Sequence, residues 1–134
     1  MRRGFTLLEL IVVIIIIGVL ATLGFTQYTK MVEKGRTAEA KSILGQIRSA
    51  EVGAQQENGA YSAIGSLPLS LPTSNATCDS QHYYWYDAAA ASGTGTATRC
   101  TSASGAGKNP VAAADVYNIT LTAAGVWSGS AGYF

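Results

Sequence analysis

The chain has 134 residues, so we expect one folded domain of modest size, smaller still if part of the chain lies in a membrane. This length disfavours an enzyme with a large core. Only 13% of the residues are charged and the formal net charge is +1, so charge gives no reason to expect binding to nucleic acid or to a strongly acidic substrate.

An apolar segment follows the short basic N-terminus. It covers residues 7–25 and is about 19 residues long, close to the roughly 20 that a helix needs to cross a bilayer. Its hydropathy predicts a membrane segment. A secretory signal peptide is the alternative, because Arg2 and Arg3 suit its start and the small residues at 18–24 could supply a cleavage site.

Glu9 is the only charged residue of this apolar segment. A charged group at membrane depth costs roughly 2.5 to 3.5 kcal/mol, so it needs a partner, and no other residue at 7–25 supplies one. Cleavage after Gly4 would give Phe5 a positively charged amine close to Glu9 along the helix. We expect this amine, from the same or an adjacent subunit, to pair with the Glu9 carboxylate.

Good helix formers without proline continue beyond the apolar segment, which predicts one helix over residues 5–57, about 80 Å long at 1.5 Å per residue. We expect it to end at Asn58-Gly59, because glycine tolerates the left-handed conformation that ends many helices. Gly18 and Gly24 each weaken the helix by about 1 kcal/mol relative to alanine, so we expect local bending or unwinding there.

The second half of this helix is amphipathic. Its apolar residues recur at spacings of three and four, which places them on one face, while Lys41, Arg48 and Gln55 fall off that face. We therefore expect this apolar stripe to support a small folded domain. The stripe consists of Ala40, Ile43, Leu44, Ile47, Ala50 and Ala54.

The residues after the helix carry strand signals that are separated by turn residues. Aromatic residues at 81–86, alternation at 116–122 and a short run at 125–127 predict a sheet of three or four strands. The segment 88–108 is almost wholly Ala, Ser, Gly and Thr, so we expect a surface loop there.

The aromatic run has two faces in a strand. Alternation sends Tyr84 and Tyr86 to one face and Tyr83 and Trp85 to the other. We expect one of these sets to pack on the apolar stripe of the helix.

Two cysteines, Cys78 and Cys100, lie beyond the membrane segment. In an exported domain an even count most simply indicates a disulfide. The loop that it would close, about 20 residues, is worth about 3 kcal/mol in the chain-entropy model. A metal site that uses both cysteines and His82 is the alternative, although these residues lack the usual ligand spacing.

The sequence shows no arrangement typical of catalysis. His82 has no nucleophile pattern around it, so we expect a structural or surface role. Asp79, Asp87 and Asp115 are isolated in sequence, and a calcium site built from them is a minor alternative. We expect no enzymatic activity, no metal and no cofactor.

The N-terminus as a whole resembles the type III signal sequence of type IV prepilins and of the related pseudopilins of type II secretion. The residues that carry this resemblance are Arg2-Arg3-Gly4, then Phe5-Thr-Leu-Leu-Glu9, then the apolar helix, and the similarity reaches about residue 57. It implies an α+β fold in which a long N-terminal helix packs through its second half on a small antiparallel sheet.

The resemblance also implies a processing route. A membrane prepilin peptidase would cut after Gly4, and Phe5 would be N-methylated. An assembly ATPase and a platform protein would build a homo-oligomeric filament in which Glu9 pairs with the N-terminal amine of a neighbouring subunit. The implied segments are a leader (1–4), an apolar filament-core helix (5–28), an amphipathic half-helix (29–57) and a globular head (58–134).

The expected function is that of a structural subunit, the major one, of an extracellular type IV pilus, with the precursor held in the inner membrane. A pseudopilin of a type II secretion system is the first alternative, although the major pseudopilins usually lack the disulfide and use a calcium loop. A membrane-anchored protein that binds a ligand with its aromatic run is the second.

The chain departs from the familiar pilin pattern in two places. Many pilins carry a proline where this chain has Thr26, and in many of them the second cysteine lies near the C-terminus, whereas Cys100 precedes further strand-like sequence. The C-terminal region is therefore expected to be a variant of the pattern.

Overall fold

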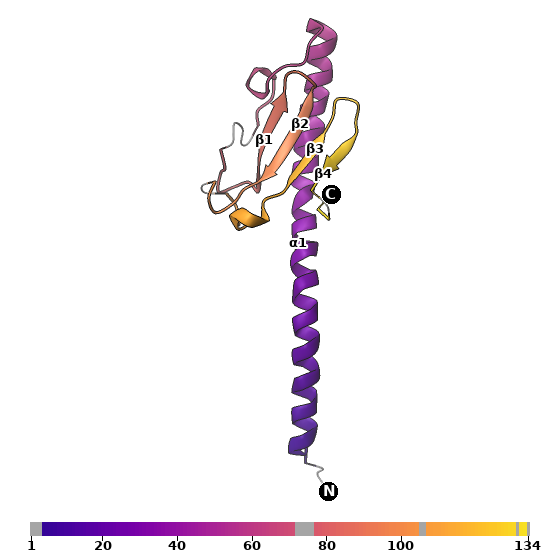
Figure 1. The fold of residues 1–134 in the computed structure, drawn as a ribbon, viewed down its shortest axis with the longest axis vertical. Coiled ribbons are helices and arrows are strands. Elements are labelled where there is room, and N and C mark those ends of the chain that lie inside the picture. The colour runs from indigo at the N-terminus through magenta and orange to yellow at the C-terminus, as the bar shows by residue number, and fades with distance from the viewer. Residues whose placement is uncertain (1–3, 72–76, 105–106, 131, 134) are drawn as a thin grey trace. The chain divides into compact units, whose positions relative to one another are not determined.

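The computed structural model describes residues 4–71, 77–104, 107–130 and 132–133. It confirms the α+β class, because one long helix precedes a four-stranded antiparallel sheet (Figure 1). The chain forms two compact units, residues 1–33 and 34–134. The basic residues of the expected leader, Arg2 and Arg3, lie outside the described residues.

The helix α1 (Leu7–Asn58) has 52 residues. It ends where the sequence predicts: Gly59 has a φ of +74°, and its amide donates a hydrogen bond of 2.9 Å to the carbonyl of Gln55. Gly18 and Gly24 both lie within regular α-helix. Their predicted flexibility stays a prediction.

The sheet consists of four strands that follow one another in space in chain order. Every neighbouring pair is antiparallel, with Tyr86 opposite Ala97 and Ala97 opposite Ile119. Two short 3-10 helices, η1 and η2, lie in the connections. The elements are η1 (Ile64–Ser66), β1 (Tyr84–Ala89), β2 (Thr94–Arg99), η2 (Ala113–Asp115), β3 (Asn118–Leu121) and β4 (Trp127–Gly129).

The expected surface loop at 88–108 is wrong, because β2 lies inside it and is an inner strand of the sheet. Gly95 and Ala97 face the core and are buried. A Cβ atom placed on Gly95 would lie 3.0 Å from Cδ2 of Leu44 and 3.2 Å from Cγ2 of Ile47. The small residues thus bring the strand backbone directly against the helix, instead of marking an exposed loop.

Strands do form near the other three predicted segments, but their bounds differ from the predicted ones. β1 begins at Tyr84 and not at residue 81, because a turn precedes it in which Asp79 accepts a hydrogen bond of 2.8 Å from the amide of Gln81. β3 lies within the predicted 116–122. β4 begins only at Trp127, since Gly125 occupies the preceding turn with a φ of +88°.

The core lies between the sheet and the part of α1 from residue 34 onward. The predicted apolar stripe is confirmed, since Ala40, Leu44 and Ile47 are completely buried. Tyr84 and Tyr86 are the aromatic set that faces this core, while Tyr83 and Trp85 are half-buried. The remaining buried apolar residues of the core are Ile64, Leu67, Ala88, Ala97, Tyr117, Ile119 and Leu121.

Candidate functional site

The N-terminus of α1 is closed by a capping box made of Thr6 and Glu9. The Glu9 amide donates to Oγ1 of Thr6 at 3.2 Å, and the Thr6 amide donates back to Oε2 of Glu9 at 2.9 Å. The Thr6 hydroxyl also donates to the same carboxylate oxygen at 2.9 Å. The first amides of an α-helix have no carbonyl partner within the helix, and here the Thr6 and Glu9 side chains accept their hydrogen bonds. This capping explains why the helix begins at Leu7 and not at Phe5.

Gly4 and Phe5, the residues predicted to flank the cleaved bond, precede the helix and are exposed. The Phe5 side chain is 83% exposed. The bond between them therefore lies in accessible, non-helical backbone.

The apolar segment of α1 is exposed on every side. Its large apolar side chains, from Leu7 to Phe25, are 43 to 74% exposed. An 18-residue window of α1 has a mean hydropathy of 2.8, so the helix is long and apolar enough to cross a membrane. Apolar surface of this extent is covered by lipid or by other apolar helices.

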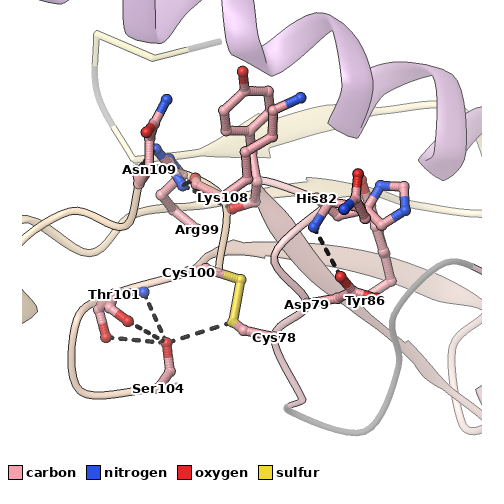
Figure 2. Close-up of a disulfide and its surroundings, with 12 residues drawn as sticks. Cys78, Asp79, His82, Tyr86, Arg99, Cys100, Thr101, Ser104, Lys108 and Asn109 are labelled. Atoms are coloured by element: carbon pink, nitrogen blue, oxygen red, sulfur yellow. Dashed lines mark hydrogen bonds between the residues drawn. A yellow bond between two sulfur atoms is a disulfide. The ribbon is translucent and has the colours of Figure 1, made fainter. Parts of the chain in front are cut away.

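The head contains the predicted disulfide, which joins Cys78 to Cys100 with a Cα–Cα distance of 6.0 Å (Figure 2). Neither cysteine is therefore a thiolate that could bind a metal, and the metal alternative is wrong. The Ser104 hydroxyl lies beside the disulfide and accepts a hydrogen bond of 2.7 Å from the Thr101 amide. Gly107 packs so closely on Cys100 that a Cβ atom there would overlap it.

Arg99, next to the disulfide, is completely buried. Its guanidinium donates hydrogen bonds to the backbone carbonyls of Tyr83 (2.9 Å), Lys108 (3.3 Å) and Asn109 (2.6 Å). Figure 2 shows Arg99 directed toward Lys108 and Asn109. Arg99 thus ties the residue just before β1 to the chain that follows the disulfide, a role that the sequence reasoning missed.

Glu39 of α1 reaches the aromatic strand. Its Oε1 accepts hydrogen bonds from the Tyr83 amide (3.2 Å) and the Tyr86 hydroxyl (3.4 Å), and it lies 3.7 Å from Nδ1 of His82. Burial, together with the Glu39 charge, raises the pKa of Tyr86 well above its usual value. His82 therefore lies beside a structural contact between helix and strand, which agrees with the role expected for it.

Glu51, another carboxylate of α1, is completely buried. Its Oε2 accepts a hydrogen bond of 2.9 Å from the Ser62 amide, and within the described residues its Oε1 has no hydrogen-bond partner. Glu51 therefore fixes the chain just after the helix. Sequence reasoning missed this contact also.

The calcium alternative finds no support in the described part of the chain. No three His, Cys, Asp or Glu side chains lie close enough together there to hold a metal ion. Asp79 and Asp87 instead accept hydrogen bonds from the amides of Gln81 and Ala88. For the ligand-binding alternative, Tyr84 and Tyr86 are completely buried in the core, so of this pair of alternating faces only Tyr83 and Trp85 are partly exposed.

Comparison with known proteins agrees with the N-terminal geometry. Residues 1–25 match the family model of the prokaryotic N-terminal methylation motif. The type IV major fimbrial protein FimA of Dichelobacter nodosus is 38% identical over 50 residues, which is 37% of this chain and 32% of that protein.

The type IV major pilin protein PilA of Myxococcus xanthus (strain DK1622) is 36% identical over 61 residues, 46% of this chain and 28% of that protein. The matched region thus spans less than one third of each of these curated relatives. No solved structure matches the chain.

The relatives named above are a major fimbrial protein and a major pilin. The methylation motif, the exposed apolar helix and the antiparallel sheet occur together in one chain. The N-terminal part of the chain therefore carries the prokaryotic N-terminal methylation motif and is similar in sequence to the corresponding part of type IV major pilins.

Proposed function

We propose that this chain is the major structural subunit of an extracellular type IV pilus. A prepilin peptidase removes the leader 1–4 from an inner-membrane precursor and Phe5 is N-methylated. Residues 5–28 then form the filament core, 29–57 carry the amphipathic half of the helix, and 58–134 form the head. An assembly ATPase and a platform protein drive the addition of subunits.

The observation that carries this proposal is the apolar surface of α1, which is exposed on every side over residues 7–25. A single helix of this kind is stable in lipid, and it is equally stable in a bundle of similar helices. A subunit that moves from membrane to filament needs a helix that suits both surroundings.

Glu9 supplies the specificity that apolar packing lacks. Exchanging lipid for another apolar helix gains little free energy, so apolar contacts discriminate poorly between correct and incorrect docking. A carboxylate that loses its solvation is stable only beside a cation in good geometry. The amine of Phe5 in a neighbouring subunit supplies that cation and fixes the register of each addition.

Electron microscopy of the source cells tests the proposal. We expect surface filaments that antibodies against the head label along their length, and we expect deletion of the gene to remove them. Restoring the gene should restore the filaments. Filaments that persist unchanged in the deletion strain would contradict the proposal.

The same strains separate the pilus from a type II secretion pseudopilus. The disulfide between Cys78 and Cys100 supports the pilus, because the family resemblance implies that major pseudopilins usually lack it. A deletion strain that keeps its surface filaments but fails to secrete folded proteins would identify a pseudopilin. A chain whose N-terminus remains uncut would instead indicate a membrane-anchored binding protein.

A further inference from the structure

The two oxygens of the Glu9 carboxylate have different surroundings. Oε2 accepts two hydrogen bonds of 2.9 Å, one from the Thr6 amide and one from the Thr6 hydroxyl. In the part of the chain that the structure describes, no hydrogen bond or ion pair involves Oε1. One oxygen is thus held by the chain itself, and the other is left for a further partner.

A glutamate side chain without such contacts samples many rotamers, and docking would have to select one of them. Ordering before docking removes that entropic loss from the binding step. The two bonds from Thr6 provide this order, because they tie the carboxylate to the first turn of its own helix. They also satisfy polar groups that lipid cannot hydrogen-bond.

We infer that Thr6 is a positioning residue for subunit docking. It holds Oε2 of Glu9 and thereby leaves Oε1 ready to accept the Phe5 amine of an incoming subunit. This inference rests on the proposed filament function and adds a second residue to the charge pair that fixes the register.

A purely structural role for Thr6 makes a different prediction. A capping box forms with glutamine as well as with glutamate at its fourth position, so helix capping alone does not need the Glu9 charge. If Thr6 only capped the helix, its loss would have the same effect with or without that charge. If it positions the carboxylate for docking, its loss matters only while Glu9 is charged.

Co-assembly with the wild-type chain measures docking directly. Each variant is expressed beside the wild-type chain, and mass spectrometry gives the ratio of variant to wild type in sheared filaments and in the membrane. We expect Thr6→Val to enter filaments about tenfold less than its share in the membrane, the effect of losing a hydrogen bond to a charged group. Thr6→Ser keeps the hydroxyl and should enter at close to the wild-type ratio.

Ser49→Ala is the control. The Ser49 hydroxyl donates to the Gly45 carbonyl at 3.0 Å on the exposed surface of α1, outside the filament core 5–28, and this bond involves no carboxylate. We expect this variant to co-assemble normally. Cleavage and methylation of all three variants should equal those of the wild type, because the bond between Gly4 and Phe5 precedes the helix and none of the substitutions changes either residue.

The decisive comparison adds Thr6→Val to Glu9→Gln. We expect the double variant to co-assemble as well as Glu9→Gln alone. A further tenfold loss in the double variant, or normal co-assembly of Thr6→Val by itself, would overturn the inference. If the wild-type chain forms no filaments at all, the proposed function fails first, so the two failures are distinguishable.

Discussion

The buried guanidinium of Arg99 donates a hydrogen bond of 2.6 Å to the backbone carbonyl of Asn109. Asn109 has a φ of +43°, a left-handed conformation that is uncommon for non-glycine residues, although asparagine adopts it more readily than most, and contacts with the rest of the fold help to hold it. Arg99 supplies one such contact, and it holds the Lys108 and Tyr83 carbonyls at the same time. One side chain therefore organises the chain beyond the disulfide.

Replacing Arg99 with methionine should destabilise the head by about 3 kcal/mol or more, because three backbone carbonyls lose the charged donor that a completely buried side chain supplies. Urea unfolding of the full chain in detergent, followed by near-ultraviolet circular dichroism, measures this. Arg48→Met is the matched control, since Arg48 is only half-buried and donates a hydrogen bond of 2.9 Å to the Ala123 carbonyl. We expect it to cost about 1 kcal/mol. Equal losses of unfolding free energy for the two variants would contradict this role of Arg99.

Gly95→Val should also destabilise the head, by about 2 to 3 kcal/mol, because the added side chain would overlap Leu44 and Ile47. Adding Leu44→Ala should recover part of that loss, since it opens space at the same contact. Thr96→Val, on the other face of β2, is the control and should change stability by less than about 0.5 kcal/mol. The same unfolding assay applies, and strictly additive losses for Gly95→Val and Leu44→Ala would count against direct packing of strand on helix.

Stability should fall at high pH through Tyr86. Its pKa in the folded head lies above the usual value of about 10, so the unfolded chain loses the proton first as pH rises. The contribution of Tyr86 to the free energy of unfolding is therefore complete below about pH 10. Above about pH 10 it is lost, at up to about 1.4 kcal/mol per pH unit. Unfolding free energies between pH 7 and pH 11 should show a shallower decline for Tyr86→Phe than for the wild type. Parallel declines would contradict this assignment.

Reduction of the disulfide between Cys78 and Cys100 should lower the unfolding free energy by about 3 kcal/mol. The cross-link stabilises the head because it reduces the conformational entropy of the unfolded chain. Unfolding with and without dithiothreitol measures the effect. A variant with both cysteines changed to serine should be insensitive to the reductant. A wild-type head equally stable in both conditions would show that the cross-link adds no stability.

Glu9→Ala should leave the precursor inserted and processed but should lower filament yield at least tenfold, because the docking amine loses its carboxylate. Quantification of sheared filaments against total subunit gives the yield. Glu57→Ala is the control, since Glu57 is an exposed carboxylate at the other end of α1. Wild-type filament yield from Glu9→Ala would refute the register argument.

The helix and its stripe could be predicted from the sequence because their signals are local. Leu44 and Ile47 recur at helical spacing, and Asn58-Gly59 carries its own stop signal. The capping box was also within reach, since a threonine three residues before a glutamate is its known pattern. From the sequence alone, the Glu9 charge was explained only by pairing with the Phe5 amine, and a bond to Thr6 was not considered.

β2 and Arg99 could not be predicted in the same way, because their burial depends on residues distant in sequence. Gly95 and Ala97 belong to the core only because Leu44 and Ile47 pack against that strand. Arg99 lies in a segment of small and polar residues, in which an arginine is usually exposed. Its burial follows from carbonyls that the fold brings together around it.

Mass spectrometry of the intact subunit from purified surface filaments tests the central claim most directly. We predict a chain that begins at Phe5, carries one methyl group on its terminal amine and contains the Cys78–Cys100 disulfide. Filaments that lack this chain, or that contain it with residues 1–4 still attached, would contradict its assignment as a processed pilus subunit.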